Sequence, residues 1–170
     1  MMRTVIMVAL GCVLLVGVAS GDKHSKGSGH SGDSKGSSFR SGLISFQFAG
    51  FIGGVQNFGA PFSLRDGEAS LTSSGDLRLE VKGLLLPDGT TGPVTQISAS
   101  LVCGGSGGMV VATTPEVDLS ADGDAKIEAK ITPLVIPCSG TIILVRLAGL
   151  NGNPSPIPFY IAVTGFDGQA

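Results

Sequence analysis

The chain has 170 residues, with 11 basic and 13 acidic side chains and a formal net charge of −2. This weakly acidic balance argues against nucleic acid as a partner, because phosphate backbones are bound by clustered Lys and Arg. The 27 Gly and 9 Pro are typical of a chain with many turns, and no stretch after residue 20 shows sustained helical periodicity.

Residues 1–20 have the features of a secretory signal peptide: a positive start at Arg3, an apolar stretch over 4–18 and small residues over 18–20. The apolar stretch is short for a membrane span, so we expect a secreted, extracellular protein with no stable span after cleavage. A lipid anchor at Cys12 is the alternative, because the ALGC tetrapeptide that ends there resembles a lipobox.

Residues 21–42 form a low-complexity tether of Gly, Ser, Lys and His, with too few apolar groups to offset the entropy of ordering. We therefore predict disorder. The tether holds four basic and two acidic residues, whereas 43–170 holds six basic and eleven acidic residues. A solvated spacer is the simplest interpretation, and contact with anionic polymers or lipid surfaces is the alternative.

Residues 43–170 are predicted to form one all-β domain that is long enough for a proper core. Turn signals such as Asp88-Gly89 and Asn151-Gly152 separate short alternating or apolar runs. Such a pattern is typical of a sandwich or a small barrel, and we predict an antiparallel two-sheet β-sandwich of immunoglobulin-like kind. The predicted strands cover residues 43–49, 68–72, 76–82, 94–103, 109–113, 116–120, 124–131, 141–147 and 159–164.

An internally repeated hairpin is the clearest pattern in the chain. Residues 68–82, EASLTSSGDLRLEVK, recur 48 positions later as residues 116–130, EVDLSADGDAKIEAK. A two-residue turn would scramble the apolar and polar faces, whereas a three-residue loop closed by a left-handed Gly75 or Gly123 restores them.

With that loop, Leu71 faces Leu77 in the first copy, and Asp118 faces Lys126 in the second. The same register places Glu68 opposite Glu80, and Glu116 opposite Glu128. Like charges directly opposite each other are destabilising, so we expect either that the strands end before the glutamates meet or that Lys82 and Lys130 relieve them.

Removal of the signal peptide leaves two cysteines, Cys103 and Cys138. An even pair in a secreted domain predicts one disulfide, and two unpaired buried thiols are the alternative. The disulfide would join the strand that follows the first hairpin to the segment that follows the second.

The candidate chemistry is sparse. Both histidines of the exported chain, His24 and His30, lie in the tether, so composition excludes Ser-His-Asp, Cys-His and His-based zinc sites in the domain. Carboxylate catalysis needs two acids that face one cleft, and only the facing glutamates offer such pairs, on predicted solvent faces. We expect no enzyme activity and no cofactor.

The segment 118–124, DLSADGD, matches the first half of a calcium-binding loop. Asp118, Asp122 and Asp124 are the candidate ligands. The expected acid at the twelfth loop position is replaced by Ala129, the flanks read as strands, and the first copy builds the same turn without these charges. A hairpin turn without a metal is therefore the preferred interpretation.

Five of the eight phenylalanines fall within residues 46–62. We expect most of them to belong to the core, and an exposed surface for a partner is the alternative.

The run GEASLTSSGDLRLEVKGL over 67–84 resembles the opening of chordin-like (CHRD) domains, and 160–163 is similar to their closing strand. This resemblance implies a secreted, CHRD-like β fold. Such domains carry a His-Ile-His motif where this chain has ISASL at 97–101, so the resemblance carries over no metal role.

The chain also resembles small secreted bacterial β-domain proteins, through VCGG at 102–105 and AVTG at 162–165. This second resemblance implies a compartment and a β fold. The sequence thus predicts a non-catalytic secreted or cell-surface module for interaction with an extracellular protein or polymer, or for structural use. A calcium-dependent adhesion or matrix module is the alternative.

Overall fold

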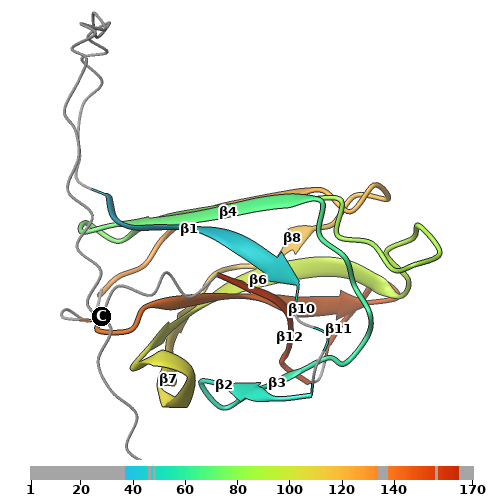
Figure 1. Cartoon of the computed structure of the whole chain (residues 1–170). Coiled ribbons are helices and arrows are strands. Elements are labelled where there is room, and N and C mark those ends of the chain that lie inside the picture. Colours follow the sequence, from blue (N-terminus) through green and yellow to red (C-terminus); the bar gives the residue numbers. More distant parts are fainter. Residues whose placement is uncertain (1–36, 46, 48, 134–137, 156, 165–170) are drawn as a thin grey trace, which may run out of the picture. The chain divides into compact units, whose positions relative to one another are not determined.

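Antiparallel strands make up most of the computed structural model, which describes residues 37–45, 47, 49–133, 138–155 and 157–164 (Figure 1). These residues belong to the unit Ser34–Ala170. The predicted signal peptide, Cys12 and residues 21–36 of the predicted tether lie outside the described residues, as do Phe46 and Phe48. Within the described part of the chain the one helical element is a three-residue 3-10 turn, η1 (Gly105–Gly107).

The strands lie close to the positions that the sequence predicts. They are β1 (Ser37–Ser45), β2 (Phe51–Ile52), β3 (Val55–Asn57), β4 (Asp66–Thr72), β5 (Asp76–Lys82), β6 (Val94–Cys103), β7 (Met109–Thr113), β8 (Val117–Asp118), β9 (Ala125–Lys130), β10 (Ile142–Leu150), β11 (Asn153–Pro154) and β12 (Phe159–Thr164).

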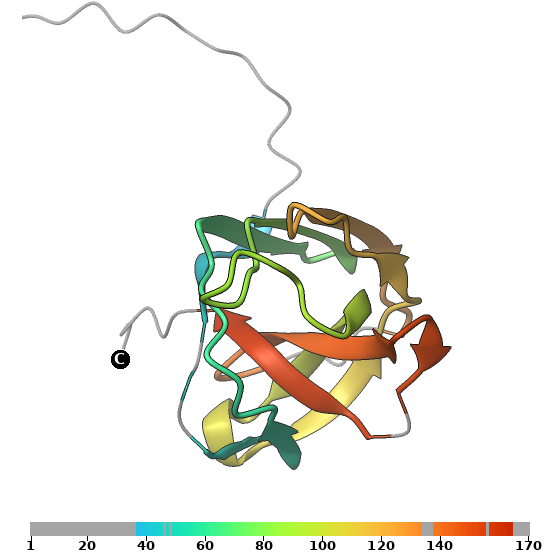
Figure 2. The same ribbon diagram turned by 90° about the vertical axis from the view of Figure 1, so that its right-hand side faces the viewer.

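The strands form one curled sheet with the hydrogen-bonded order β7-β6-β10-β12-β1-β4-β5-β9. The curl depends on β1, whose residues 37–42 pair with β4 while residues 43–45 pair with β12. Figure 2 shows the two limbs of the curl facing each other. The fold is therefore all-β and antiparallel, apart from the parallel pair β3–β12. Two separate sheets are not confirmed, because β1 joins the limbs.

Alternation along the strands places one shared core between the two limbs. Leu79 and Ile127 enter it from β5 and β9, and Ile97 and Ile143 enter it from β6 and β10. All four side chains are at most 1% exposed. Each contributes about 1.5–3 kcal/mol through burial, so the limbs stabilise each other.

A second, smaller core lies on the outer side of the limb that contains β10 and β12. The β2–β3 hairpin supplies Ile52 and Val55, which pack with Leu144 and Val163. This hairpin covers one end of the outer surface, and the other end carries polar side chains around Arg146.

The start of the domain differs from the prediction. The predicted boundary at residue 43 is too late, because β1 begins at Ser37 and residues 37–42 of the predicted tether are strand. Phe39 packs against the core, and Ser41 lies directly opposite Ala69. The edge of β4 offers backbone partners that composition alone does not reveal, which explains the error.

The first repeated hairpin is confirmed residue by residue. Leu71 pairs with Leu77 and Glu68 with Glu80, across a loop of Ser73, Ser74 and Gly75. Gly75 has φ 88° and Gly123 has φ 74°, so the left-handed glycine is confirmed in both copies.

The second copy keeps the turn but not the hairpin. Gly123 donates its N–H to the carbonyl oxygen of Ser120 at 2.9 Å, as Gly75 does to Thr72 at 3.0 Å. The strand before the turn, β8, pairs with β6, whereas the strand after it, β9, pairs with β5. The predicted pairs Asp118–Lys126 and Glu116–Glu128 are therefore wrong. The two longer strands β6 and β5 have open edges, and β8 and β9 pair with these edges instead of with each other.

The β5–β9 pair relates the two copies by a local two-fold axis. Equivalent residues Leu79 and Ile127 lie directly opposite each other. An antiparallel arrangement about this pair sets each base of one copy against an acid of the other. Arg78 lies opposite Glu128, and Glu80 lies opposite Lys126.

Candidate functional site

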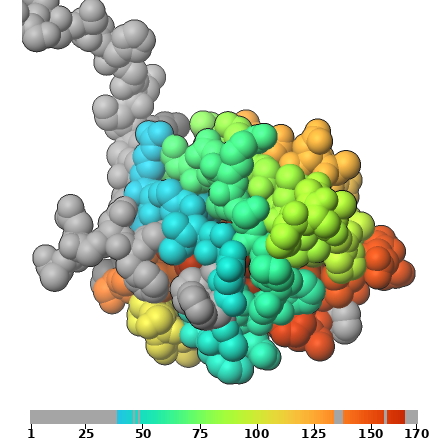
Figure 3. Space-filling model, turned by 45° about the vertical axis from the view of Figure 1, so that its right-hand side comes forward, coloured from blue at the N-terminus to red at the C-terminus, as the bar shows by residue number. Residues whose placement is uncertain are grey.

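A group of six charged side chains lies on the exposed side of the limb that contains β1, β4, β5 and β9. Figure 3 shows the surface of β1, in cyan, beside the green surface that contains β4 and β5. Six exposed residues line a hollow of about 420 Å³ there, together with Ser70 and Leu79. We call this the charged face: Arg40, Glu68, Arg78, Glu80, Lys126 and Glu128.

The three acids of the charged face are each held by a base. Arg40 binds Glu68 through Nη2–Oε2 at 3.0 Å and through a second contact from Nε, which raises the pKa of Arg40. Lys82 Nζ lies 2.9 Å from Glu80 Oε1, which raises the pKa of Lys82.

Lys126 Nζ lies 3.0 Å from Glu128 Oε1. Its hydrogen bond, with a smaller electrostatic contribution from Arg78, lowers the pKa of Glu128. All three acids therefore have a cationic partner in an ion pair.

The structure shows how the facing glutamates are tolerated, and the expected relief by Lys82 is confirmed for Glu80. Glu68 does lie opposite Glu80, but Arg40 reaches the first from β1 and Lys82 neutralises the second from its own strand. Glu80 also has Lys126 on its other side. The cross-strand repulsion is thus offset by bases on three neighbouring positions.

Of the two carboxylate pairs considered for catalysis, Glu68 and Glu80 lie opposite each other and line one hollow, whereas Glu116 and Glu128 do not pair. Glu68 and Glu80 are both engaged in ion pairs, and Glu116 lies outside the β5–β9 ladder that contains Glu128.

The three calcium candidates do not converge. Gln96 Nε2 donates to Asp118 Oδ1 at 2.9 Å. The backbone N–H of Gly83 donates to Asp124 Oδ1 at 2.8 Å, and Asp122 is exposed. Among the residues that the structure describes, no group of three or more His, Cys, Asp or Glu side chains is placed to hold a metal ion.

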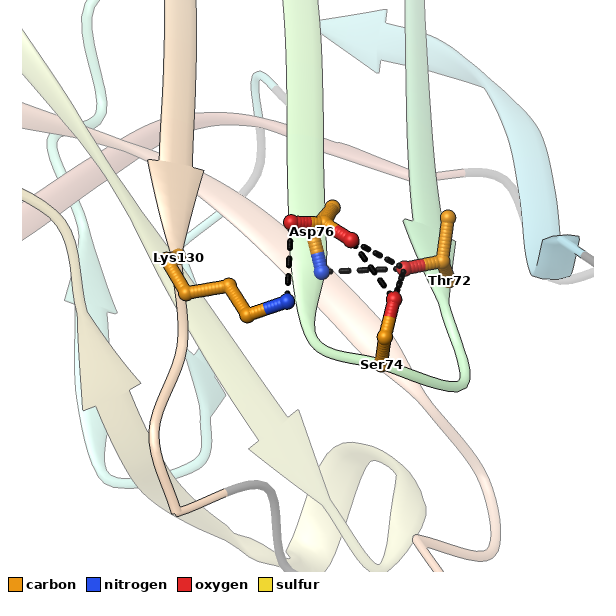
Figure 4. Close-up of polar contacts among 4 residues, drawn as sticks. All are labelled: Thr72, Ser74, Asp76 and Lys130. Carbon is orange, nitrogen blue, oxygen red and sulfur yellow. Dashed lines mark hydrogen bonds and ion pairs between the residues drawn. The ribbon is translucent and has the colours of Figure 1, made fainter. Parts of the chain in front are cut away.

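The turn of the first copy contains the most strongly perturbed carboxyl (Figure 4). Ser74 Oγ donates to Asp76 Oδ2 at 2.6 Å, and Lys130 Nζ donates to Asp76 Oδ1 at 2.9 Å. These two bonds, with a third from Thr72, lower the pKa of Asp76 to about 2. The network fastens the turn of the first copy to the last residue of β9.

The predicted disulfide between Cys103 and Cys138 is confirmed. Cys103 ends β6, and Cys138 lies in the connection that precedes β10. A disulfide is compatible with an oxidising, extracellular compartment. Within the described part of the chain, no helix has the length and apolar character needed to cross a membrane.

The phenylalanine segment is divided between core and surface. Phe62 is 1% exposed, and Phe58 packs between Phe62 and Phe159, with ring centroids 6.3 and 5.5 Å away. Phe51 is 67% exposed. Core use is therefore confirmed for Phe58 and Phe62 and is wrong for Phe51.

Sequence reasoning missed one polar pocket, around Arg146. Its lining comes from strands that are far apart in the sequence, which no local pattern reveals. The available signal was a single arginine within the apolar run IILVRLAGL of β10.

Comparison with known proteins assigns no relationship. No family model, no curated protein and no solved structure matches this chain.

Proposed function

We propose that the protein is an exported, non-catalytic β module that acts by binding, and that the charged face is its main contact surface. The observation that supports this proposal is the pairing of every acid on that face with a base. These ion pairs engage the carboxylate oxygens, and Lys126 lowers the pKa of Glu128, which disfavours a proton-donating role for it.

The charged face suits a partner of mixed charge, such as an extracellular protein or polymer. Three bases and three acids alternate on strands that a packed core holds in place. Alternating charges give orientation and selectivity more than affinity. We also propose that the fold is a two-layer sandwich of immunoglobulin-like or CHRD-like kind. The single core between the limbs supports this proposal.

Binding is tested by passing the exported chain over immobilised extracellular proteins and polysaccharides. We expect retention that weakens as salt rises and that falls in Arg78→Gln and Lys126→Gln, with no product released. Asp122→Asn, in the exposed turn, is the matched control and should bind normally. If retention changed neither with salt nor in the two variants, the charged face would not be the contact surface.

The absence of catalysis is tested with a broad panel of hydrolase substrates. Turnover that disappears in Glu116→Gln would overturn the non-catalytic proposal. Export is tested by the intact mass of the secreted chain, which should show cleavage after Ser20, no lipid at Cys12 and the loss of two thiol protons.

A further inference from the structure

A pocket of about 290 Å³ opens on the outer side of the limb that contains β6 and β10, away from the charged face. We call it the Arg146 pocket. Its lining residues are Ser98, Thr113, Thr114, Glu116, Arg146, Leu147, Ala148, Ser155 and Pro158.

Arg146 is only partly satisfied inside this pocket. Its Nη1 donates to Ser100 Oγ at 3.1 Å and to Thr113 Oγ1 at 3.3 Å, two hydroxyls that are themselves bonded at 2.8 Å. Its Nε is shielded from solvent and has no partner. In the described part of the chain no carboxylate lies within ion-pair distance of Arg146.

An arginine without a carboxylate in a partly buried position is costly, because desolvation disfavours its charged form and leaves donors unused. Burial accordingly lowers the pKa of Arg146, although a guanidinium stays protonated at any ordinary pH. A bound anion would supply acceptors for the N–H groups of Nη1 and Nη2 that make no bond to Ser100 or Thr113, whereas the shielded Nε would stay without one.

Two further polar groups in the pocket lack partners among the described residues. Ser98 lies directly opposite Arg146 in the β6–β10 ladder and is 5% exposed, and its hydroxyl makes no hydrogen bond there. Glu116 is exposed and belongs to no ion pair of the described chain. The Arg146 guanidinium, the Ser98 hydroxyl and the Glu116 carboxylate thus line the same pocket, and no hydrogen bond or ion pair joins them to one another.

We infer that the Arg146 pocket binds a small zwitterion of the amino-acid type. The ligand carboxylate accepts from Nη1 and Nη2 of Arg146 and from the Ser98 hydroxyl, since a planar guanidinium matches a carboxylate in a bidentate way. The ligand ammonium lies toward Glu116.

The lining favours a zwitterion over other anions. A single arginine with neutral hydroxyls neutralises one negative charge, and Glu116 repels a dianion such as sulfate or phosphate. The volume limits the ligand to a small molecule. This inference does not depend on the charged face, which lies on a different limb of the sheet.

The test is an NMR titration of the exported chain with glycine, acetate and sulfate, which follows the Arg146 Nε–H resonance and the backbone amide of Ser98. We expect saturable shifts with glycine, weaker ones with acetate and the weakest with sulfate. Ser98→Ala should weaken glycine binding about tenfold, as the loss of one hydrogen bond to a charged group implies.

Two substitutions test separately the recognition of the ligand carboxylate and of the ligand ammonium. Arg146→Gln should abolish binding of all three probes, and Glu116→Gln should keep acetate binding while removing the preference for glycine. Arg65→Gln, at an exposed arginine outside the pocket, is the matched control. Amide spectra of each variant show whether the fold is kept.

Several results would overturn the inference. They are the absence of saturable shifts in the wild-type chain, glycine binding that is unchanged in a folded Ser98→Ala or Arg146→Gln variant, tighter binding of sulfate than of glycine, and a glycine preference that persists in Glu116→Gln.

Discussion

At the residue scale, two glycines explain why both repeat copies have the same residue type at the end of the turn. Gly75 and Gly123 both have positive φ, and each also lies against the backbone that follows the strand of the other copy. The N–H of Ile131 donates to the carbonyl of Gly75 at 2.8 Å, and the N–H of Leu84 donates to that of Gly123 at 2.9 Å. A side chain at either position would be strained and would also collide with backbone.

Substitution of Gly75 by Ala should therefore cost more than left-handed strain alone. The matched control is Gly89→Ala, where φ is 78° but an added Cβ would meet nothing within 4 Å. We expect about 1 kcal/mol for Gly89→Ala and roughly 2–4 kcal/mol for Gly75→Ala, measured by urea unfolding. Equal losses would show that the contact with Ile131 contributes nothing.

The Asp76 network should make stability depend on acid pH. The folded pKa of Asp76 is lowered to about 2, below its ordinary unfolded value of about 4. Its stabilising contribution is therefore complete above about pH 4 and is lost as the pH falls from there through about 2. A carbon-detected NMR titration of the Asp76 carboxyl should show this low midpoint.

Ser74→Ala removes the contact that lowers the pKa of Asp76 most, so the midpoint should move upward. Ser73→Ala, at the neighbouring turn residue, is the control and should leave the titration unchanged. A midpoint near 4 in the wild-type chain would contradict the network as described.

At the scale of elements, the last strands of the two repeat copies, β5 and β9, carry the same charge pattern, and this pattern is complementary when the two strands run antiparallel. Base, apolar residue and acid follow one another in Arg78-Leu79-Glu80 and in Lys126-Ile127-Glu128. Antiparallel pairing about the central residue sets base against acid in both directions. The sequence predicted both strands, but it did not predict that they are neighbours.

Charge reversal at this ladder tests the pairing. Arg78→Glu should lower the melting temperature by a few degrees, because it places like charges opposite each other at Glu128. The double variant Arg78→Glu with Glu128→Arg should recover most of the loss. Asp122→Lys, in the exposed turn, should melt like the wild-type chain, and failure of the double variant to recover would exclude direct pairing.

At the scale of the molecule, β1 joins the two limbs, and the disulfide closes a long loop of the chain. β1 is shared by both limbs, and the Cys103–Cys138 bond closes a loop with a sequence separation of 35. A loop of this length restricts the unfolded chain by about 4 kcal/mol in the chain-entropy model.

Replacement of both cysteines by Ser should therefore lower the free energy of unfolding by about 3–4 kcal/mol, measured by urea titration under oxidising conditions. The wild-type chain under strong reductant is the control and should approach the variant. An unchanged urea midpoint in the variant would mean that the bond contributes no stability.

The local signals in the sequence identified most of the strands, the three-residue turns and the cysteine pair. These features depend on alternation, on glycine geometry and on composition, which act within a few residues. The start of β1 was missed for the same reason, because Ser37 to Gly42 lack local strand character and acquire it by pairing with β4.

The candidate sites were less predictable. The charged residues of the repeat were recognised, but Arg40, which pairs with Glu68, comes from β1, and Glu80 and Glu128 are paired with lysines of their own strands. The Arg146 pocket brings β6, β10 and the segments after β7 and β11 together, and no local pattern links them.

The sequence by itself determined that this is an all-β chain with a twice-used turn, a disulfide pair and no histidine in the folded domain. The tertiary structure alone decided which strand edges meet, why facing glutamates are tolerated and where an unpaired arginine lies. The physical reason is that turns and strand periodicity are local, whereas edge pairing joins segments whose choice of partner depends on the path of the whole chain.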